Sequence, residues 1–218
     1  MSKLRTSRLK RGKSPRKANG QVRVLTENTY RKSSKKEIER DFGKRCAYSM
    51  VHEDHADGAS GMEIDHFNPT LTGRRRHVYG NLFPGAGSCN LSKSNTWPDA
   101  DDLAVGMRYL NPCKEIDYGE HIFEERESGL LVATSTAGFY QIVNLGLNDS
   151  HFVRLRLDRT DLCERLYSNM FALRDRLADV ENLEHVEVVI KSLNVQLSKM
   201  IPFIPEPPYG AELYRTDI

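Results

Sequence analysis

The sequence lacks several features that would assign the chain to a membrane or to a secreted class. It has no run of about 18 apolar residues, the length of a membrane-spanning helix, so no membrane span is expected. Its basic N-terminus lacks the apolar stretch of a secretory signal, so we expect a cytoplasmic protein. Only four cysteines occur in 218 residues. Without a secretion signal we expect a reducing compartment, in which they remain thiols.

Acidic residues are nearly absent from the start of the chain. The first 36 residues hold thirteen Lys and Arg and one acid, Glu27, whereas the remaining 182 residues hold 19 basic and 29 acidic side chains. Nearly all the attraction for phosphate therefore lies at the N-terminus. Residues 1–20 have too few apolar groups to form a core, so we expect a basic, disordered arm over residues 1–34. The arm contacts nucleic acid, docks an acidic protein partner or is a solvated tail.

A polar segment in the middle of the chain holds the side chains needed for hydrolysis at a metal. Asp65 and His66 are followed by Asn81, and then by Asn90 and Lys93. Asp and Asn supply oxygen ligands, which suit Mg²⁺ or Mn²⁺. A neutral histidine beside the metal can act as general base, because its pKa lies near the working pH. A lysine adds a point charge for a phosphate oxygen.

The order and spacing of these residues resemble the HNH nuclease family. The family pattern runs Asp-His-x-x-Pro, Asn-Leu and Cys-Asn-x-x-Lys, and this chain has Asp65-His66-Phe67-Asn68-Pro69, Asn81-Leu82 and Cys89-Asn90-Leu91-Ser92-Lys93. The resemblance implies a ββα-metal finger in which Asp65 and Asn90 hold Mg²⁺ or Mn²⁺ and His66 is the general base. It also implies that Asn81 orients the catalytic histidine or its loop.

Many members of that family also carry two Cys-x-x-Cys knuckles that bind a structural zinc. Here each knuckle keeps one cysteine, Cys46 in the first and Cys89 in the second. A structural zinc takes four nitrogen or sulfur ligands, so we expect no structural zinc unless His52 or His55 contributes. The catalytic metal is a separate site and is not affected by this loss.

The resemblance extends further along the chain, to HNH proteins of bacterial anti-phage and retron-associated loci. It continues through Trp97-Pro98, Asn111-Pro112-Cys113 and Leu145-Gly146-Leu147-Asn148. It implies a defence nuclease that cuts DNA and works with an ATPase partner. RNA is an alternative substrate, because phosphodiester chemistry does not distinguish the two. The alternative function is a degenerate HNH module that binds nucleic acid or a protein partner without cleaving.

The expected fold class is α+β, with an HNH core over residues 35–98 and a C-terminal module over 99–218. In the core, the capping-box pattern that starts at Ser34 predicts a helix over about 35–43. A strand is predicted over 62–66 and a short helix over about 90–95. The loop between them carries Arg74, Arg75 and Arg76, which we expect to contact the nucleic-acid backbone together with Lys93.

In the C-terminal module the apolar pattern predicts a β-hairpin and a helical hairpin. The two strands of the β-hairpin are expected over 130–133 and 139–143. The two helices are expected from about 161 and over about 183–200. The first of them has an apolar face formed by Leu162, Leu166, Met170, Leu173 and Leu177.

Two polar groups of the same module have alternative interpretations. Asp99, Asp101 and Asp102 either complement the dipole at a helix N-terminus or form a second metal site. Asp117 and His121 are either structural loop residues or part of a further site.

Deletion of residues 1–20 tests the arm, because it removes eight basic side chains and no acidic one. If the arm binds phosphates, the slope of log affinity against log salt should flatten by up to roughly 0.9 for each phosphate of duplex DNA that the truncated chain no longer neutralises. Fluorescence anisotropy across a salt series measures this slope for the full chain and the truncated chain. An unchanged slope would remove the nucleic-acid role from the arm.

Overall fold

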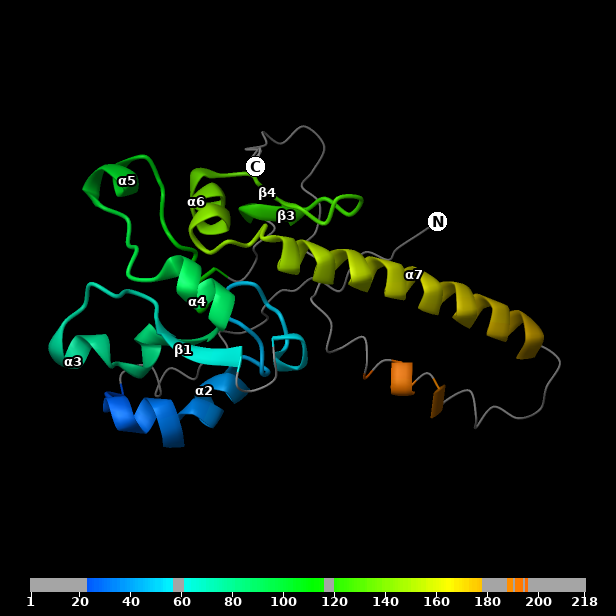
Figure 1. Ribbon diagram of the computed structural model, residues 1–218, viewed down its shortest axis with the longest axis horizontal. Helices are drawn as coiled ribbons and strands as arrows, with labels where there is room; N and C mark the ends of the chain where they lie inside the picture. Colours follow the sequence, from blue (N-terminus) through cyan, green and yellow to red (C-terminus); the bar gives the residue numbers. More distant parts are fainter. Residues whose placement is uncertain are drawn as a thin grey trace.

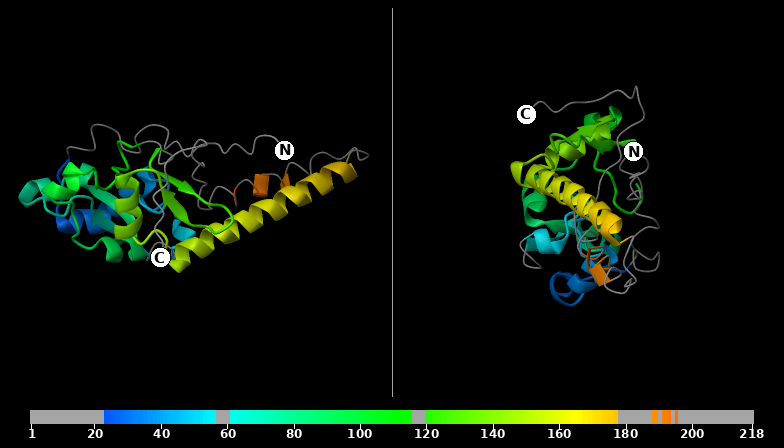
Figure 2. Two further views of the ribbon diagram at one scale, coloured as in Figure 1. Left: turned by 90° about the horizontal axis from the view of Figure 1, so that it is seen from above. Right: turned by 90° about the vertical axis from the view of Figure 1, so that its right-hand side faces the viewer.

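The computed structural model describes residues 23–56, 61–115 and 120–177, together with residues 188, 189, 191–193 and 195. Its described part is an α+β fold, in which two small antiparallel sheets are combined with several helices (Figure 1). The long helix α7 (Ser150–Leu177) extends away from the part that holds both sheets, as the views in Figures 1 and 2 agree. The predicted fold class is therefore confirmed at this level.

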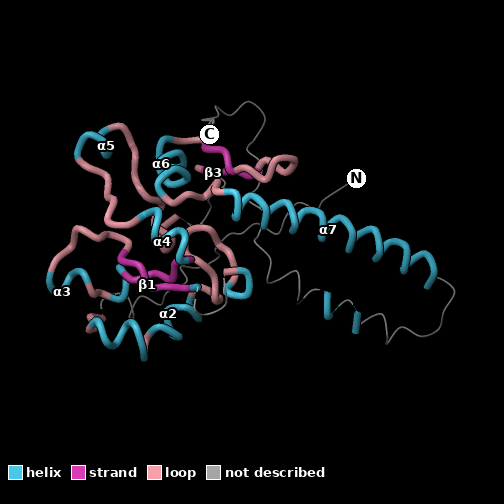
Figure 3. The backbone as a smooth tube through the Cα atoms, viewed as in Figure 1, coloured by secondary structure: helices cyan, strands magenta, loops and turns pink. Residues whose placement is uncertain are grey.

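The first sheet is a pair of antiparallel strands followed directly by a helix. Strand β1 (Met62–His66) pairs with β2 (Leu82–Ala86), and helix α4 (Gly87–Lys93) begins at the next residue. All five residues of β2 are buried, because the strand is covered on both faces. Figure 3 shows α4 lying beside the pair of strands. The predicted strand over 62–66 matches β1, and α4 begins three residues before the predicted helix.

The connection between β1 and β2 makes two short helical turns, α3 (Gly73–Arg76) and the 3₁₀ turn η4 (Tyr79–Asn81). Gly73 has a φ of 53°, a left-handed conformation that glycine adopts without steric cost. At the end of the connection the Asn81 carbonyl accepts a hydrogen bond of 2.9 Å from the backbone N–H of Phe67. This bond closes the connection just beyond the end of β1.

The N-terminal part of the described chain packs against this unit. A π-helical turn η1 (Thr29–Ser33) runs into α2 (Lys35–Asp41), and a 3₁₀ turn η2 (Glu53–His55) follows. The predicted helix over 35–43 is present as α2, but the capping box at Ser34 is not formed. Ser34 has helical dihedral angles and no side-chain cap, because the chain is already helical before it.

A small cluster of buried side chains joins this N-terminal part to the sheet. It consists of Leu25, Tyr30, Ile38, Tyr79 and Leu82. A larger cluster of buried side chains extends from Phe42 to Phe152. Since that cluster contains residues from both sides of position 98, the first sheet shares its core with the second.

The second sheet corrects the predicted β-hairpin. Strand β4 (Leu131–Ala133) pairs with β3 (Ile122–Glu124), and residues 136–144 form helix α6 (Thr136–Asn144) instead of a second strand. Ser135 caps this helix, since its side chain accepts a hydrogen bond from the Gly138 backbone. A Cβ on Gly138 would lie 2.0 Å from the carbonyl oxygen of His121, so the helix approaches β3 only because this residue is glycine.

The start of the C-terminal module is a short helix, α5 (Ala100–Ala104). The Asp99 side chain accepts hydrogen bonds from the backbone of Asp101 and Asp102, and the Asp102 side chain accepts one from the Asp99 N–H. This capping box agrees with the interpretation in which the three aspartates stabilise the start of a helix.

Two buried arginines fasten α7 to the second sheet. Arg156 donates hydrogen bonds to the carbonyl oxygens of Gly129 and Leu147, and Arg159 pairs with Glu124 of β3. Helix α7 begins eleven residues earlier than the predicted start near 161, because its first turns are held by these polar anchors and by Phe152 rather than by a regular apolar stripe.

Several expectations lie outside the described residues. These are most of the basic arm, Asp117 and most of the second C-terminal helix. Within the part of the chain that the structure describes, none of the helices combines the length and the apolarity needed to cross a lipid bilayer.

The ion pair between Arg159 and Glu124 gives a test of the fold. Both side chains are at most 2% exposed, so the Arg159→Met variant leaves a buried carboxylate without its partner and should lose about 3–5 kcal/mol of unfolding free energy. Replacing both residues, as Arg159→Met with Glu124→Leu, should restore much of that loss. Urea unfolding measures both variants.

The matched control is Arg165→Met, which breaks the exposed pair with Asp161 on the same helix. Its effect should stay within about 1 kcal/mol. Equal losses for Arg159→Met and Arg165→Met would show that the buried pair does not hold α7.

Candidate functional site

Asp65 lies at the centre of the candidate site, on the face of β1 that meets α4. Its side chain is 6% exposed. The Tyr48 hydroxyl donates a hydrogen bond to its Oδ2. The Lys93 Nζ lies 3.1 Å from Oδ1 and 3.0 Å from Oδ2 of Asp65, and 2.9 Å from the carbonyl oxygen of His66. The carboxylate and the ammonium therefore neutralise each other in the interior, where strand and helix meet.

Burial and attraction act in opposite directions on this pair. Burial raises the pKa of Asp65, while Lys93 and the Tyr48 hydrogen bond lower it. Burial lowers the pKa of Lys93, while Asp65 raises it. Both residues are driven toward their neutral forms by the loss of water, and each keeps its charge through the other.

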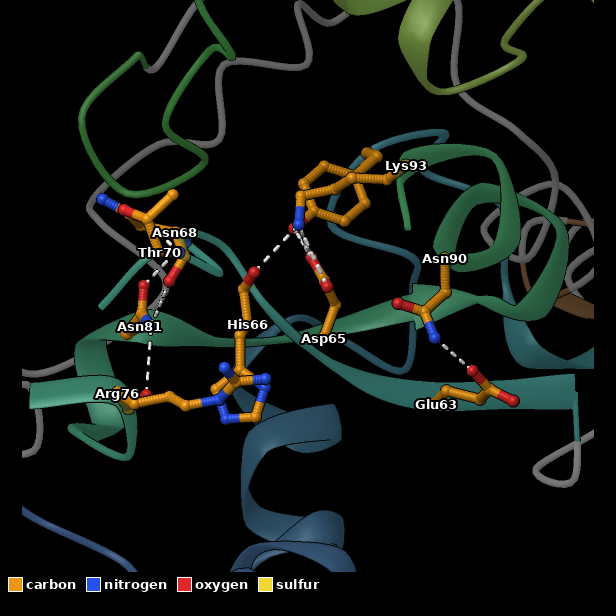
Figure 4. A network of polar contacts seen from close by, with 10 residues as sticks. Glu63, Asp65, His66, Asn68, Thr70, Arg76, Asn81, Asn90 and Lys93 are labelled. Atoms are coloured by element: carbon orange, nitrogen blue, oxygen red, sulfur yellow. Dashed lines mark hydrogen bonds and ion pairs between the residues drawn. The ribbon is translucent and has the colours of Figure 1, made fainter. Parts of the chain in front are cut away.

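The structure places Lys93 differently from the sequence expectation. Its side chain is 0% exposed, so the ammonium does not reach a phosphate on the surface in this structure. Its three oxygen partners instead fix the end of α4 to the end of β1 (Figure 4). The buried lysine therefore links α4 to β1 at the candidate site.

Asn90 lies one turn before Lys93 on α4, and Glu63 of β1 orients its amide. The Asn90 Nδ2 donates a hydrogen bond to the Glu63 carboxylate. Figure 4 shows the amide nitrogen facing Glu63 and the amide oxygen on the side toward Asp65. Sequence reasoning did not identify Glu63, although its position two residues before Asp65 puts it on the same face of the strand.

A small space without a side chain separates Asp65 from Asn90. It lies over Gly85 of β2, where an added Cβ would meet the Tyr48 ring at 3.7 Å, the Asp65 Cβ at 3.8 Å and the Asn90 Cβ at 3.9 Å. These three side chains therefore line one cradle. Glycine at this position leaves the space between the two expected metal ligands open.

His66 is half-buried and does not face Asp65. Figure 4 shows its ring and the Asp65 carboxylate on opposite sides of β1, which is the normal alternation of successive strand residues. On its own side, the His66 Nε2 lies 3.3 Å from Nδ1 of His77. Tyr30 meets the His66 ring edge-on, with centroids 5.4 Å apart.

The surroundings of His66 keep its imidazole neutral. Burial lowers its pKa, and Arg76, the neighbouring His77, Lys93 and Arg31 lower it further, to about 4. The arginines and the lysine among these neighbours are all positively charged. At neutral pH this imidazole is unprotonated, and the positive charge around it attracts an anion. Its pKa of about 4 lies below the working pH, in contrast to the sequence expectation, which makes it a weaker base than a free histidine.

Asn81 is the anchor of the loop that follows His66. Its Oδ1 accepts a hydrogen bond of 2.9 Å from the backbone N–H of Asn68, and its Nδ2 donates to the carbonyl oxygens of Asn68 and Arg76 at 3.1 and 3.0 Å. The side chain thus ties both ends of the loop together, which is the geometry that orientation of the histidine loop requires.

The three arginines of α3 differ in their surroundings. Arg74 and Arg75 are exposed, whereas Arg76 is half-buried and donates a hydrogen bond of 3.2 Å to the carbonyl oxygen of Pro69. Arg76 also reaches the His66 ring (Figure 4). Arg76 therefore lies on the His66 side of β1.

The two remaining knuckle cysteines lie together in the core. Burial raises the pKa of Cys46, but hydrogen bonds from Cys89, Ser49 and the Ala86 backbone outweigh it and bring the pKa to about 6. The Sγ of Cys46 accepts backbone N–H groups of Tyr48 and Ser49 at 3.4 and 3.3 Å. Over the described residues, no three His, Cys, Asp or Glu side chains gather as a metal cluster.

The residues that sequence reasoning missed are Tyr30, Tyr48, Glu63 and His77. Glu63 and His77 are polar residues close in sequence to the motif, and this is a weak signal. Tyr30 and Tyr48 come from distant segments, and only the tertiary structure brings them to the site.

Comparison of the chain with protein-family models, with curated proteins and with solved structures found no match.

The lowered pKa of His66 predicts a dependence of stability on pH. An unfolded chain binds the proton near pH 6.5, whereas the folded chain binds it only near pH 4. Between these values the unfolded state holds more protons, so the unfolding free energy falls as the pH falls. The His66→Asn variant lacks this contribution and should lose less stability than the wild type from about pH 7 to about pH 4.5. Urea unfolding at each pH measures the difference, and equal losses in both proteins would contradict a depressed pKa of His66.

Proposed function

We propose that the protein is a metal-dependent phosphodiester hydrolase of the HNH class, built on a ββα-metal finger formed by β1, β2 and α4. Its substrate is DNA. His66 is the general base, and Asp65 and Asn90 hold a divalent cation. The observation that carries the proposal is the placement of the motif residues at one point of the fold. Asp65 and Asn90 lie beside Gly85, and His66 follows Asp65 at the end of β1.

A neutral base among cations suits the hydrolysis of a phosphodiester in particular. The substrate is an anion, so Arg76 and Arg31 attract it toward the imidazole. The same charges keep the imidazole unprotonated before the reaction but also weaken it as a base, and the negative charge of a bound phosphodiester would offset them. A base that works on a neutral or cationic substrate gains nothing from such a field.

The donor set fits Mg²⁺ or Mn²⁺. Asp65 and Asn90 offer two hard oxygen ligands on either side of the cradle over Gly85, and Mg²⁺ takes few protein ligands because it keeps most of its water. The Asp65 carboxylate already binds Lys93, so a metal would share this carboxylate with the ammonium. When bound, the cation would offset the negative charge that develops on the phosphate.

The chain's own side chains perform the remaining chemistry. His66 removes a proton from a water molecule, whose oxygen bonds to phosphorus while the bond from phosphorus to the leaving alkoxide breaks. The alkoxide takes a proton from solvent water, and the imidazolium returns its proton to solvent. Asp65 and His66 are the last two residues of β1. A phosphodiester that crosses the end of this strand has the carboxylate on one side and the imidazole on the other. Asn81 holds the loop at that end in place.

The basic surface gives affinity for nucleic acid without sequence recognition. Arg74 and Arg75 are exposed on α3, directly before Arg76, whose charge acts on His66. Arginines of this kind contact the phosphate backbone, which positions a duplex but carries no sequence information. The resemblance to bacterial defence proteins adds an ATPase partner, which would supply the choice of target. RNA is the alternative substrate.

The second candidate is a module that binds nucleic acid or a partner and does not cleave. The observation that favours it is the pairing of Asp65 with Lys93, because an ammonium already occupies the carboxylate expected to hold the metal. The two functions differ in one measurable property, which is magnesium-dependent cleavage.

The His66→Ala variant should lose DNA cleavage by about 10²–10⁴-fold while its fold is kept, because it removes the general base. Magnesium-dependent nicking of plasmid DNA measures the rate, and circular dichroism checks the fold. The control is His55→Ala, which removes an exposed histidine of η2 and should cleave like the wild type. Cleavage by His66→Ala within about threefold of the wild type would exclude this mechanism.

Metal binding is tested separately in the Asn90→Ala variant. Its affinity for Mg²⁺ or Mn²⁺ in calorimetric titration should fall, because one of the two oxygen ligands is gone. An unchanged affinity would place the metal elsewhere. A wild-type protein that binds DNA but cuts neither DNA nor RNA in the presence of metal would establish the binding module instead.

A further inference from the structure

A second imidazole lies beside the proposed base and has no role in the reaction described so far. His77 ends α3, and its Nδ1 is 3.3 Å from Nε2 of His66. The two rings are in edge contact, with centroids 5.3 Å apart. One hydrogen bond joins the two nitrogens, so one ring donates the proton and the other accepts it.

The structure holds both rings in this arrangement from several directions. Tyr30 is 2% exposed, meets His66 edge-on and stacks on His77 with centroids 5.5 Å apart. Asn81 binds the carbonyl oxygen of Arg76, directly before His77, and the backbone of Asn68, two residues after His66. The contact between the two rings is therefore held by side-chain packing and by hydrogen bonds to the backbone on either side of the rings.

The direction of the hydrogen bond decides which nitrogen of His66 is basic. If His66 donates from Nε2, both rings carry their proton on Nε2, which is the tautomer that neutral histidine prefers in water. If His77 donates from Nδ1, both rings must carry their proton on Nδ1, the less favoured tautomer. In a neutral imidazole, the bond made by one nitrogen fixes the state of the other. The first arrangement leaves the lone pair of His66 Nδ1 free.

We propose that His77 is a positioning residue for the base, and that it accepts a hydrogen bond from His66 Nε2–H through its own Nδ1. This bond fixes His66 in the Nε2–H tautomer and leaves Nδ1 as the atom that takes the proton from water. The inference rests on the proposed function of His66, but the hydrogen bond itself is measured without any cleavage.

Two variants of His77 separate the hydrogen bond from the packing. His77→Phe keeps an aromatic ring against Tyr30 and removes the acceptor. His77→Asn keeps an acceptor, since its Oδ1 replaces the ring Nδ1, and removes the ring. A matched control is His55→Asn, which changes an exposed histidine on another element.

The experiment records long-range ¹H–¹⁵N spectra of the full chain with ¹⁵N-labelled histidine, in which protonated and unprotonated ring nitrogens have well-separated shifts. The His66 signals are assigned by their absence from the His66→Asn variant. The wild type, His77→Asn and His55→Asn should show His66 with its proton on Nε2. His77→Phe should show a mixture of tautomers. On magnesium-dependent cleavage, His77→Phe should lower kcat about tenfold, the effect of removing one hydrogen bond, and leave KM nearly unchanged.

The outcomes distinguish this inference from the proposed function. A wild-type His66 with its proton on Nδ1, or a tautomer that does not change in His77→Phe, overturns the role of His77 even if the protein cleaves DNA. The expected tautomers in a protein that cuts no nucleic acid support the hydrogen bond and overturn the nuclease function. A loss of kcat in His77→Asn together with an unchanged kcat in His77→Phe would show that the ring packs and does not position.

Discussion

The buried ion pair between Asp65 and Lys93 is the interaction on which the rest of the site depends. It joins the last turn of α4 to the end of β1, and the same ammonium also binds the carbonyl oxygen of His66. Loss of either partner would leave a charge in the interior without compensation, which is costly. A pair of apolar side chains could fill the same volume, but it would not fix the His66 carbonyl. The pair therefore sets the position of α4, and with it the distance between Asn90 and Asp65 across Gly85.

Much of the first sheet was predictable from the sequence because its signals are local. The strand predicted over 62–66 is present as β1, and the motif residues Asp65, His66 and Asn90 fall on β1 and α4 as expected. The second sheet was not predictable in the same way. Residues 139–143 are apolar enough for a strand, yet the Ser135 cap and the close approach of Gly138 to β3 select a helix. Both are tertiary effects that an apolar pattern does not contain.

The site itself was predictable only in its motif residues. The burial of Lys93 could not be read from a lysine placed three residues after Asn90, because exposed lysines have the same spacing. Tyr48 reaches Asp65 across 17 positions of sequence, and Tyr30 reaches His66 from the N-terminal side. The motif identifies the residues expected to form the site. The side chains that hold those residues in position come from segments whose own sequences contain no functional motif.

Successive side chains of β1 point to opposite faces of the strand, so Asp65 and His66 lie on opposite faces and each is held by a different set of residues. On one side of the strand, Tyr48 and Lys93 hold the carboxylate of Asp65, while on the other Tyr30 and His77 hold the imidazole of His66. The second set depends on η1, which lies before the sequence-based boundary at residue 34. Since Tyr30 packs against both imidazoles and belongs to the buried cluster with Ile38 and Tyr79, a core that began at residue 35 would lack the ring that packs against His66 and His77. The unit that carries the proposed base therefore includes the turn over Thr29–Ser33.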